Sequence, residues 1–404
     1  MIDTLFILFI LFQNIIIHYL PSVTSYWDEA MCLVLGFLLF IGAKGKLYKS
    51  DFACITLLFC VIIIGVIGNV TFSYQKSYSA IIRDIVGFIK FPLVFIALYR
   101  MKVGYKLSKR LLTIIPFLKL IEKIILVFGI LSLFINIGMS QSEIRNAIHP
   151  YMFLYTHPTY LTTGSISILC LLNAAQEASI KDDIIILSNI ALAMRTKGLV
   201  FIAVYIFLKY GSKWLRKIKV FYWAAIMTII FIVAQSKLRL YASFSGSPRE
   251  SLYAGAITLA QTYFPIGTGF ATYASHISGK YFSEVYNFIH ISGLYTALGE
   301  ISPDIGDAGI PYYVGQFGIL GIALIGILIY KMIRMSFFNL DQTRKIGVIA
   351  LWMMIAVSIP TEAILINNGA EIGFTMAMVS LLARRNMFAI NNCMKETEHN
   401  THEC

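Results

Sequence analysis

The stretch FACITLLFCVIIIGVIGNV, residues 52–70, decides the fold class of this protein. It carries no charged residue and matches the roughly 20 apolar residues that a helix needs to cross the hydrocarbon core of a bilayer. Similar apolar runs recur along the chain and are separated by short charged segments. The sequence therefore predicts an all-α polytopic membrane protein.

The composition of the whole chain agrees with this prediction. Of its 404 residues, 58% are hydrophobic and 13% are charged, whereas a soluble domain carries roughly 25% charged residues. The formal net charge of +12 comes from Lys and Arg in short segments between apolar runs, where membrane topology requires cations. No basic segment is interleaved with aromatic residues as in RNA-binding surfaces, so we expect no nucleic-acid partner.

Apolar runs bounded by charge predict about twelve membrane-spanning helices within a single integral membrane domain, residues 1–404. These spans are expected at residues 4–20, 30–43, 52–70, 85–99, 115–138, 158–175, 183–194, 198–210, 218–235, 312–332, 345–366 and 370–383. Residues 77–90 have an amphipathic pattern, typical of a helix that lies along the membrane interface before the fourth span. The polar residues 386–404 are expected to form a disordered cytoplasmic tail.

The distribution of Lys and Arg predicts the orientation of the chain. These residues concentrate after the even-numbered spans, as in the segment after the second span, with Lys44, Lys46 and Lys49. Because cytoplasmic loops are enriched in cations, both termini should be cytoplasmic. Two longer outward segments remain, residues 139–157 and residues 236–311. The second, between spans nine and ten, is too long for an ordinary connection and is expected to fold and to function.

The segment ALAMRTKGLV, residues 191–200, places Arg195 and Lys197 between two apolar runs on the outward side. This placement opposes the usual charge bias, and an ionisable group at such a boundary is a candidate for function. The alternative is an arginine whose side chain extends to lipid phosphates.

The large outward loop contains SGSPRESLYAGAITLAQTYFPIGTGFATY, residues 245–273. Its pattern predicts a short helix from Ser251 to Tyr263, with Arg249 at its opening. The following FPIGTGF predicts a tight turn through Gly267 and Gly269, whose backbone N–H groups can approach an anion. The alternative is a turn that only joins two interfacial helices.

Other outward residues can take up a proton or bind phosphate. Carboxylates and imidazoles of the large loop are candidate bases, although each can equally be a solvated loop residue: His276, His290, Glu300, Asp304 and Asp307. They lack metal-ligand spacings such as HxH or HExxH, so we expect no metal and no cofactor. In the earlier loop, Arg145 can pair with phosphate oxygens, and His157 is either functional or a helix-entry residue before Pro158.

The outward segments together therefore gather a set of guanidinium groups with a glycine turn and several candidate bases. Such a set can bind a diphosphate and activate a hydroxyl near the membrane surface, because fixed cations absorb the charge of a departing phosphate. The arginines concerned are Arg145, Arg195, Arg239 and Arg249.

These residues resemble those of the O-antigen polymerase and ligase superfamily of polytopic glycosyltransferases. ALAMRTKG is similar to the family's T-x-S-R-G-A element, with Arg195 at its arginine. The family's R-x(n)-P-x-G-x-G pattern is matched by Arg249, Pro265, Gly267 and Gly269. DAGIPYYVGQFGILG, residues 307–321, resembles the end of the family's large loop and the GxxG that follows it. The resemblance implies a GT-C-like architecture.

One motif distinguishes the ligases of this family from the polymerases, and this sequence lacks it. Ligases have a His–Asn pair eleven residues before the first glycine of GxxG. Counting back from Gly318 leads to Asp307 and Ala308 in this sequence. This departure counts against a ligase and resembles the polymerase (Wzy-type) branch.

The resemblance implies a metal-independent, inverting polymerase of surface polysaccharide at the periplasmic face of the bacterial inner membrane. Arg195 and Arg249 would hold the diphosphate of an undecaprenyl-linked glycan, and Asp307 would deprotonate the acceptor hydroxyl. Implied substrate-binding residues are Arg145, Lys197, Arg239, Gly267, Gly269, His157 and His290. Membrane lipids and a chain-length regulator are the further partners that this class implies.

Two alternatives stay open at this point. One is the ligase reaction, which transfers finished polymer to lipid A-core. The other is a flippase or transporter, a class that twelve spans with both ends inside would suit. Transporters built from repeats show corresponding halves, whereas here the long loop interrupts the second half alone.

Overall fold

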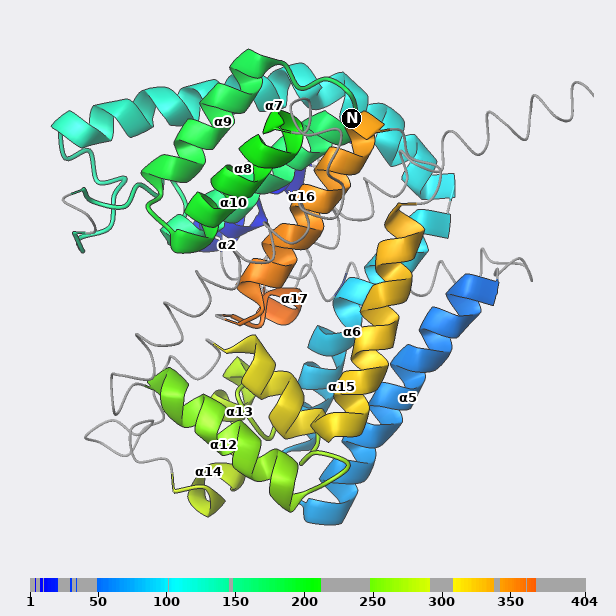
Figure 1. Cartoon of the computed structure of the whole chain (residues 1–404). Helices are drawn as coiled ribbons and strands as arrows, with labels where there is room; N and C mark the ends of the chain where they lie inside the picture. The colour runs from blue at the N-terminus through cyan, green and yellow to red at the C-terminus, as the bar shows by residue number, and fades with distance from the viewer. Residues whose placement is uncertain are drawn as a thin grey trace, which may run out of the picture.

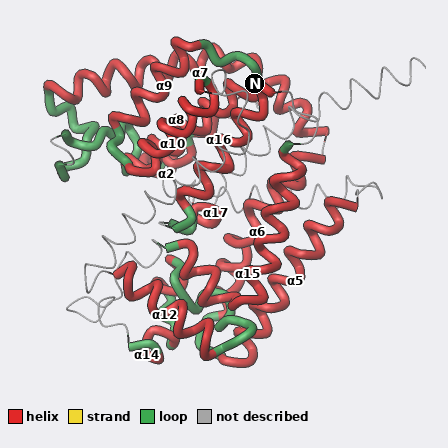
Figure 2. The backbone as a smooth tube through the Cα atoms, viewed as in Figure 1, coloured by secondary structure: helices red, strands yellow, loops and turns green. Residues whose placement is uncertain are grey.

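A computed structural model of the chain describes residues 11–20, 49–100, 102–144, 148–211, 248–290, 308–337, 342–360 and 362–367, with a few isolated positions before residue 49 (Figure 1). These residues are mostly helical and contain no strand (Figure 2). Within this part of the chain, the helices at Ser50–Phe72 and Gly309–Ser336 are long and apolar enough to cross a membrane. The all-helical prediction is confirmed for the described residues.

The helices, in chain order, are α2 (Gln13–Tyr19), α5 (Lys49–Phe72), α6 (Tyr78–Arg100), α7 (Lys102–Phe134), α8 (Pro158–Ala174), α9 (Ile180–Leu192), α10 (Thr196–Lys209), α12 (Pro248–Thr262), α13 (His276–Lys280), α14 (Val285–Phe288), α15 (Gly309–Ser336), α16 (Gln342–Ser358) and α17 (Ile364–Asn367). The spans expected at 218–235 and 370–383 lie outside the described residues, as does nearly all of 30–43.

Three predicted segments differ clearly from the structure. The fifth span, expected at 115–138, belongs to a helix that begins earlier, α7 (Lys102–Phe134). The amphipathic segment 77–90 and the fourth span form one continuous helix, α6. The eleventh span, expected at 345–366, is interrupted, because α16 ends at Ser358 and α17 begins only at Ile364. Pro360 explains the interruption, since proline lacks an N–H and disfavours helical geometry in the preceding residue.

One group of helices consists of α5, α6, α12 and α15, drawn in the lower part of Figure 1. Helices α5 and α15 are antiparallel, because Cys54 of α5 contacts Met335 near the end of α15. Later in α5, a Cβ on Gly68 would lie 2.7 Å from the carbonyl oxygen of Gly267, in the loop that packs on the first turns of α15. Glycines therefore let the two helices and this loop pack closely.

The second group consists of α7 to α10 with α16, in the upper part of Figure 1. Helices α8 and α10 are parallel, because Arg195 contacts His157 at one end and Lys209 binds Asn173 at the other. Helix α9 joins them in the opposite direction. We call the two ends of this group the Arg195 end and the Lys209 end.

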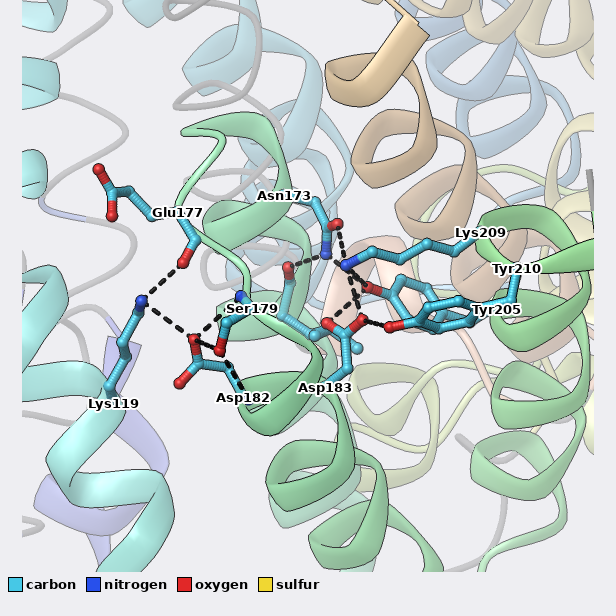
Figure 3. A network of polar contacts seen from close by, with 10 residues as sticks. Lys119, Asn173, Glu177, Ser179, Asp182, Asp183, Tyr205, Lys209 and Tyr210 are labelled. Carbon is cyan, nitrogen blue, oxygen red and sulfur yellow. Dashed lines mark hydrogen bonds and ion pairs between the residues drawn. The ribbon is translucent and has the colours of Figure 1, made fainter. Parts of the chain in front are cut away.

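A buried polar network joins α8, α9 and α10 at the Lys209 end (Figure 3). The Nζ atom of Lys209 lies 2.6 Å from Oδ2 of Asp183. Tyr205 donates its hydroxyl to Oδ1 of the same carboxylate over 2.9 Å, and Asn173 donates to the Tyr205 hydroxyl over 2.7 Å. Because a buried charge is tolerated when it is paired and hydrogen-bonded, this network fixes the helix ends opposite Arg195.

Candidate functional site

Arg195 occupies the junction between α9 and α10. Helix α9 ends at Leu192, Met194 adopts a left-handed conformation with φ of 49°, and Arg195 is the N-cap residue of α10. The Nη2 atom of Arg195 lies 3.2 Å from Nδ1 of His157 and also contacts Nε2 of that ring. His157 in turn is the N-cap residue of α8. The structure thus brings together two residues that the sequence placed in separate outward segments.

Lys197, in the first turn of α10, forms an ion pair with Glu362. The side chains are 10% and 18% exposed, so both charges are largely removed from water. Glu362 belongs to the segment 359–362 that follows α16. This segment was expected to be the end of a span, and its carboxylate was not anticipated as a partner of Lys197.

The segment 359–362 also contacts α12 and α15. Tyr253 of α12 donates a hydrogen bond from its hydroxyl to the carbonyl oxygen of Pro360 over 2.7 Å. At the start of α15, a Cβ added to Gly309 would lie 2.5 Å from the carbonyl oxygen of Ile359. Helices α10, α12 and α15 therefore meet at this segment.

Three helices begin at or beside this junction: α8 after His157, α10 after Arg195 and α15 after Ala308. The N-terminus of a helix carries a partial positive charge and free N–H donors, so anions are favoured there. Arg195 and Lys197 lie at the same place, and the charge of Lys197 is balanced there by Glu362. The arrangement is suited to bind an anionic group such as a phosphate.

The positions of the other two predicted catalytic residues, Arg249 and Asp307, follow from residues close to them in the sequence. Arg249 is the second residue of α12, one helical turn before Tyr253, which contacts Pro360. Asp307 lies outside the described residues and directly precedes Ala308, the N-cap residue of α15, in the sequence. Four more candidate residues also lie outside the described part of the chain: Arg145, Arg239, Glu300 and Asp304.

The glycine turn at residues 265–269 packs against α15. Thr268 and Gly269 donate their backbone N–H groups to the carbonyl oxygens of Gly315 and Gln316, over 3.0 and 2.9 Å. A Cβ on Gly267 would lie 2.4 Å from the carbonyl carbon of Gln316. These N–H groups are engaged within the protein, so the contacts favour the packing role of the two glycines over anion binding.

The turn at residues 265–269 supplies hydrogen-bond partners at a break in helix α15. Gly318 interrupts the helix with φ of 59° and ψ of −166°. The N–H of Leu320 donates to the carbonyl oxygen of Pro265 over 3.1 Å. Backbone groups freed by the break therefore find partners in the turn, as buried polar groups require.

The loop after the turn is held by two polar side chains from α5 and α6. Asn69 donates from Nδ2 to the carbonyl oxygen of Phe270 and accepts from its N–H, over 2.9 and 2.8 Å. Asp84, which is fully buried, accepts from the N–H of Ala271 over 2.7 Å. These bonds fix the path of the large loop between α12 and α13.

His290, another predicted substrate-binding residue, lies elsewhere. It is exposed and follows α14, where Phe288 packs on Tyr74 and Tyr263. In Figure 1, α14 lies in the lower group, away from the start of α10. The structure does not bring His290 to Arg195.

The sequence interpretation missed two carboxyl groups beside this site. Glu362 pairs with Lys197, and Glu122 of α7 contacts Asn189 in the last turns of α9. Both stand within apolar runs, where an ionisable residue is by default a candidate for function. That signal was present in the sequence and would have identified both.

The sequence matches no protein-family model and no curated protein.

Proposed function

We propose that this chain is a polymerase of O-antigen or a related surface polysaccharide, acting on undecaprenyl-diphosphate-linked glycans. The observation that carries the proposal is the meeting of Arg195, Lys197 and His157 at helix N-termini, against the segment 359–362. The same segment contacts α12, whose second residue is Arg249, and α15, which Asp307 precedes in the sequence.

In this proposal the protein crosses the bacterial inner membrane about twelve times, with both termini cytoplasmic. The Arg195 end then faces the periplasm. This orientation is supported by the alternating directions of α8, α9 and α10 and by the cations that follow the even-numbered spans. The large loop, residues 236–311, would lie between spans nine and ten.

The chemistry is a glycosyl transfer with a lipid diphosphate as the leaving group. Arg195 and Arg249 bind the diphosphate oxygens, because the planar guanidinium matches them in pairs. The acceptor hydroxyl gives its proton to Asp307 while its oxygen attacks the anomeric carbon. The bond from that carbon to the diphosphate breaks, undecaprenyl diphosphate leaves with the electron pair, and the configuration inverts.

His157 has a positioning role in this scheme. Its ring contacts the guanidinium of Arg195, which is otherwise a flexible side chain at the end of a short connection. An arginine that is held in place loses less conformational entropy when it binds phosphate. Lys197 is tied to Glu362, so we assign it to the support of this junction and to the local positive field.

The test is substitution in the native host followed by separation of surface polysaccharide on a gel. Arg195→Ala should collapse the ladder of polymer lengths to a single repeat unit on the core, at normal protein level. Arg195→Lys should restore the ladder only in part, since the point charge remains but the paired geometry is lost. Arg110→Ala, an exposed arginine of α7, is the matched control and should leave the ladder unchanged.

The same experiment separates the alternatives. A ligase variant would lose all decoration of the core while lipid-linked polymer accumulated. If the protein is a transporter, the variant would lose periplasmic repeat units altogether. The break in α15 at Gly318 is the structural feature that favours a transporter, because transporters contain interrupted helices. A normal ladder from Arg195→Ala would refute the polymerase proposal.

A further inference from the structure

Glu122 is a buried carboxyl group that forms no ion pair within the described part of the chain. It lies on α7, is 1% exposed and faces α8 and α9. No Lys or Arg of the described residues forms an ion pair with it. Of the lysines near it on the same helix, Lys119 pairs with Asp182 over 3.0 Å and Lys123 is exposed. A buried carboxylate without a cation is strongly disfavoured.

The partner of Glu122 is the amide of Asn189. Asn189 donates from Nδ2 to Oε2 of Glu122 over 2.7 Å and to the Glu122 carbonyl oxygen over 2.9 Å. Ser165 of α8 approaches the same carboxyl oxygen, at 3.3 Å. The two bonds from Nδ2 determine the orientation of the amide, since the reversed amide would place an oxygen against two oxygens.

Two oxygen atoms of this pair remain without hydrogen-bond partners in the described structure. They are Oε1 of Glu122 and Oδ1 of Asn189, both buried. If the carboxyl is ionised, both atoms are acceptors and neither can satisfy the other. A proton on Oε1 turns one of these acceptors into a donor and removes the buried negative charge.

We propose that Glu122 binds a proton and is held as a neutral acid, paired with Asn189, between α7, α8 and α9. The surroundings agree with this state. The groups that face it from α8 and α9, Ser165 and Asn189, are neutral. The nearby Tyr151 donates its hydroxyl to the carbonyl oxygen of Ile125 over 2.9 Å and so does not serve the carboxyl group.

The pair also positions the candidate site. The carbonyl oxygen of Asn189 accepts from the N–H of Ala193 over 3.3 Å, at the end of α9. Two residues later the chain reaches Arg195. Glu122 therefore holds the last turns of the helix that presents Arg195, and we assign it as a positioning residue. This second part rests on the proposed function.

Infrared spectroscopy of the purified full-length protein at neutral pH tests the proton site directly. The wild type should show the C=O stretch of a protonated carboxyl, and the difference spectrum with Glu122→Gln should show its loss. If that variant does not fold, ¹³C labelling of glutamate should shift the band in the wild type. The proposal is overturned if the band is absent at neutral pH, or if labelling leaves it unmoved.

The positioning role is tested in the host. Glu122→Gln should keep the polysaccharide ladder, because a neutral amide preserves the pairing, whereas Glu122→Ala should reduce polymer at least tenfold at equal protein level. A full ladder from Glu122→Ala would remove the positioning role. The infrared result does not depend on the reaction, so it stands even if Arg195→Ala leaves the ladder normal and the proposed function fails.

Discussion

Lys197 and Glu362 form an ion pair although 165 positions separate them in the sequence. The pair joins the first turn of α10 to the segment after α16, beside the candidate phosphate-binding residues. Because the side chains are only 10% and 18% exposed, removal of either partner leaves a charge that water solvates poorly.

Glu362→Gln should therefore destabilise the protein by about 2 kcal/mol, between the values typical of surface and buried pairs. Thermal unfolding of the purified protein would show this as a lower Tm. The matched control is Glu284→Gln, which breaks an exposed pair with Lys76 at 3.6 Å. That change should cost less than about 1 kcal/mol. Equal losses from both variants would contradict the structural role of the Lys197 pair.

The carboxylate of Asp182 should make the stability of the folded protein depend on pH in the acidic range. Burial alone would raise its pKa, but hydrogen bonds from Ser179 and the ammonium group of Lys119 lower the pKa of Asp182 below its ordinary value of 3.8. A lowered folded-state pKa adds stability that is present above the unfolded value and is lost as the pH falls through the folded value.

The measurement is Tm as a function of pH for the wild type and for Asp182→Asn. The wild type should be the more stable protein near pH 7, and the difference should shrink as the pH falls below about 4. A constant difference between the two proteins across this range would show that Asp182 contributes no pH-dependent stability.

The glycines of the turn should be irreplaceable for steric reasons. A Cβ on Gly269 would lie 2.4 Å from the N atom of Asn69, and its φ of +99° disfavours any other residue. Gly269→Ala should therefore abolish accumulation of folded protein. Gly326→Ala, on the helix α15 against which the turn packs but with open space around it, should fold normally and gain up to about 1 kcal/mol. Monodisperse elution of the detergent-solubilised variants distinguishes the two outcomes.

Asn69 should be required for the path of the large loop. Asn69→Ala leaves the buried N–H and carbonyl of Phe270 without partners, at a cost of about 1–3 kcal/mol for each group. Protection from limited proteolysis between α12 and α13 should fall in this variant. Unchanged protection and Tm would show that the loop is held by other contacts.

The location of most helices was predictable from the sequence, because hydropathy and helical length act locally along the chain. The span expected at 158–175 matches α8, and the short helix expected from Ser251 matches α12 within three residues. Arg195 and Lys197 were also identifiable, since charged residues between apolar runs stand out. His157 was found as a candidate beside a proline that opens a helix.

Other features of the site could not be predicted because they depend on partners distant in sequence. The break of α15 at Gly318 is stable only because the turn at 265–269 supplies donors and acceptors to the freed backbone. The role of Gly267 and Gly269 follows from that contact, and a glycine pattern alone does not distinguish packing from anion binding.

The amino-acid sequence by itself determined that this chain is helical and apolar, and in which segments most of its described helices lie, because those properties follow from local composition and period. Tertiary structure alone decided which charges meet. The pairing of Lys197 with Glu362, of Arg195 with His157 and of Glu122 with Asn189 requires helices to be packed. In a low-dielectric interior the partner of a charge or a polar group, rather than its position in the sequence, determines its role.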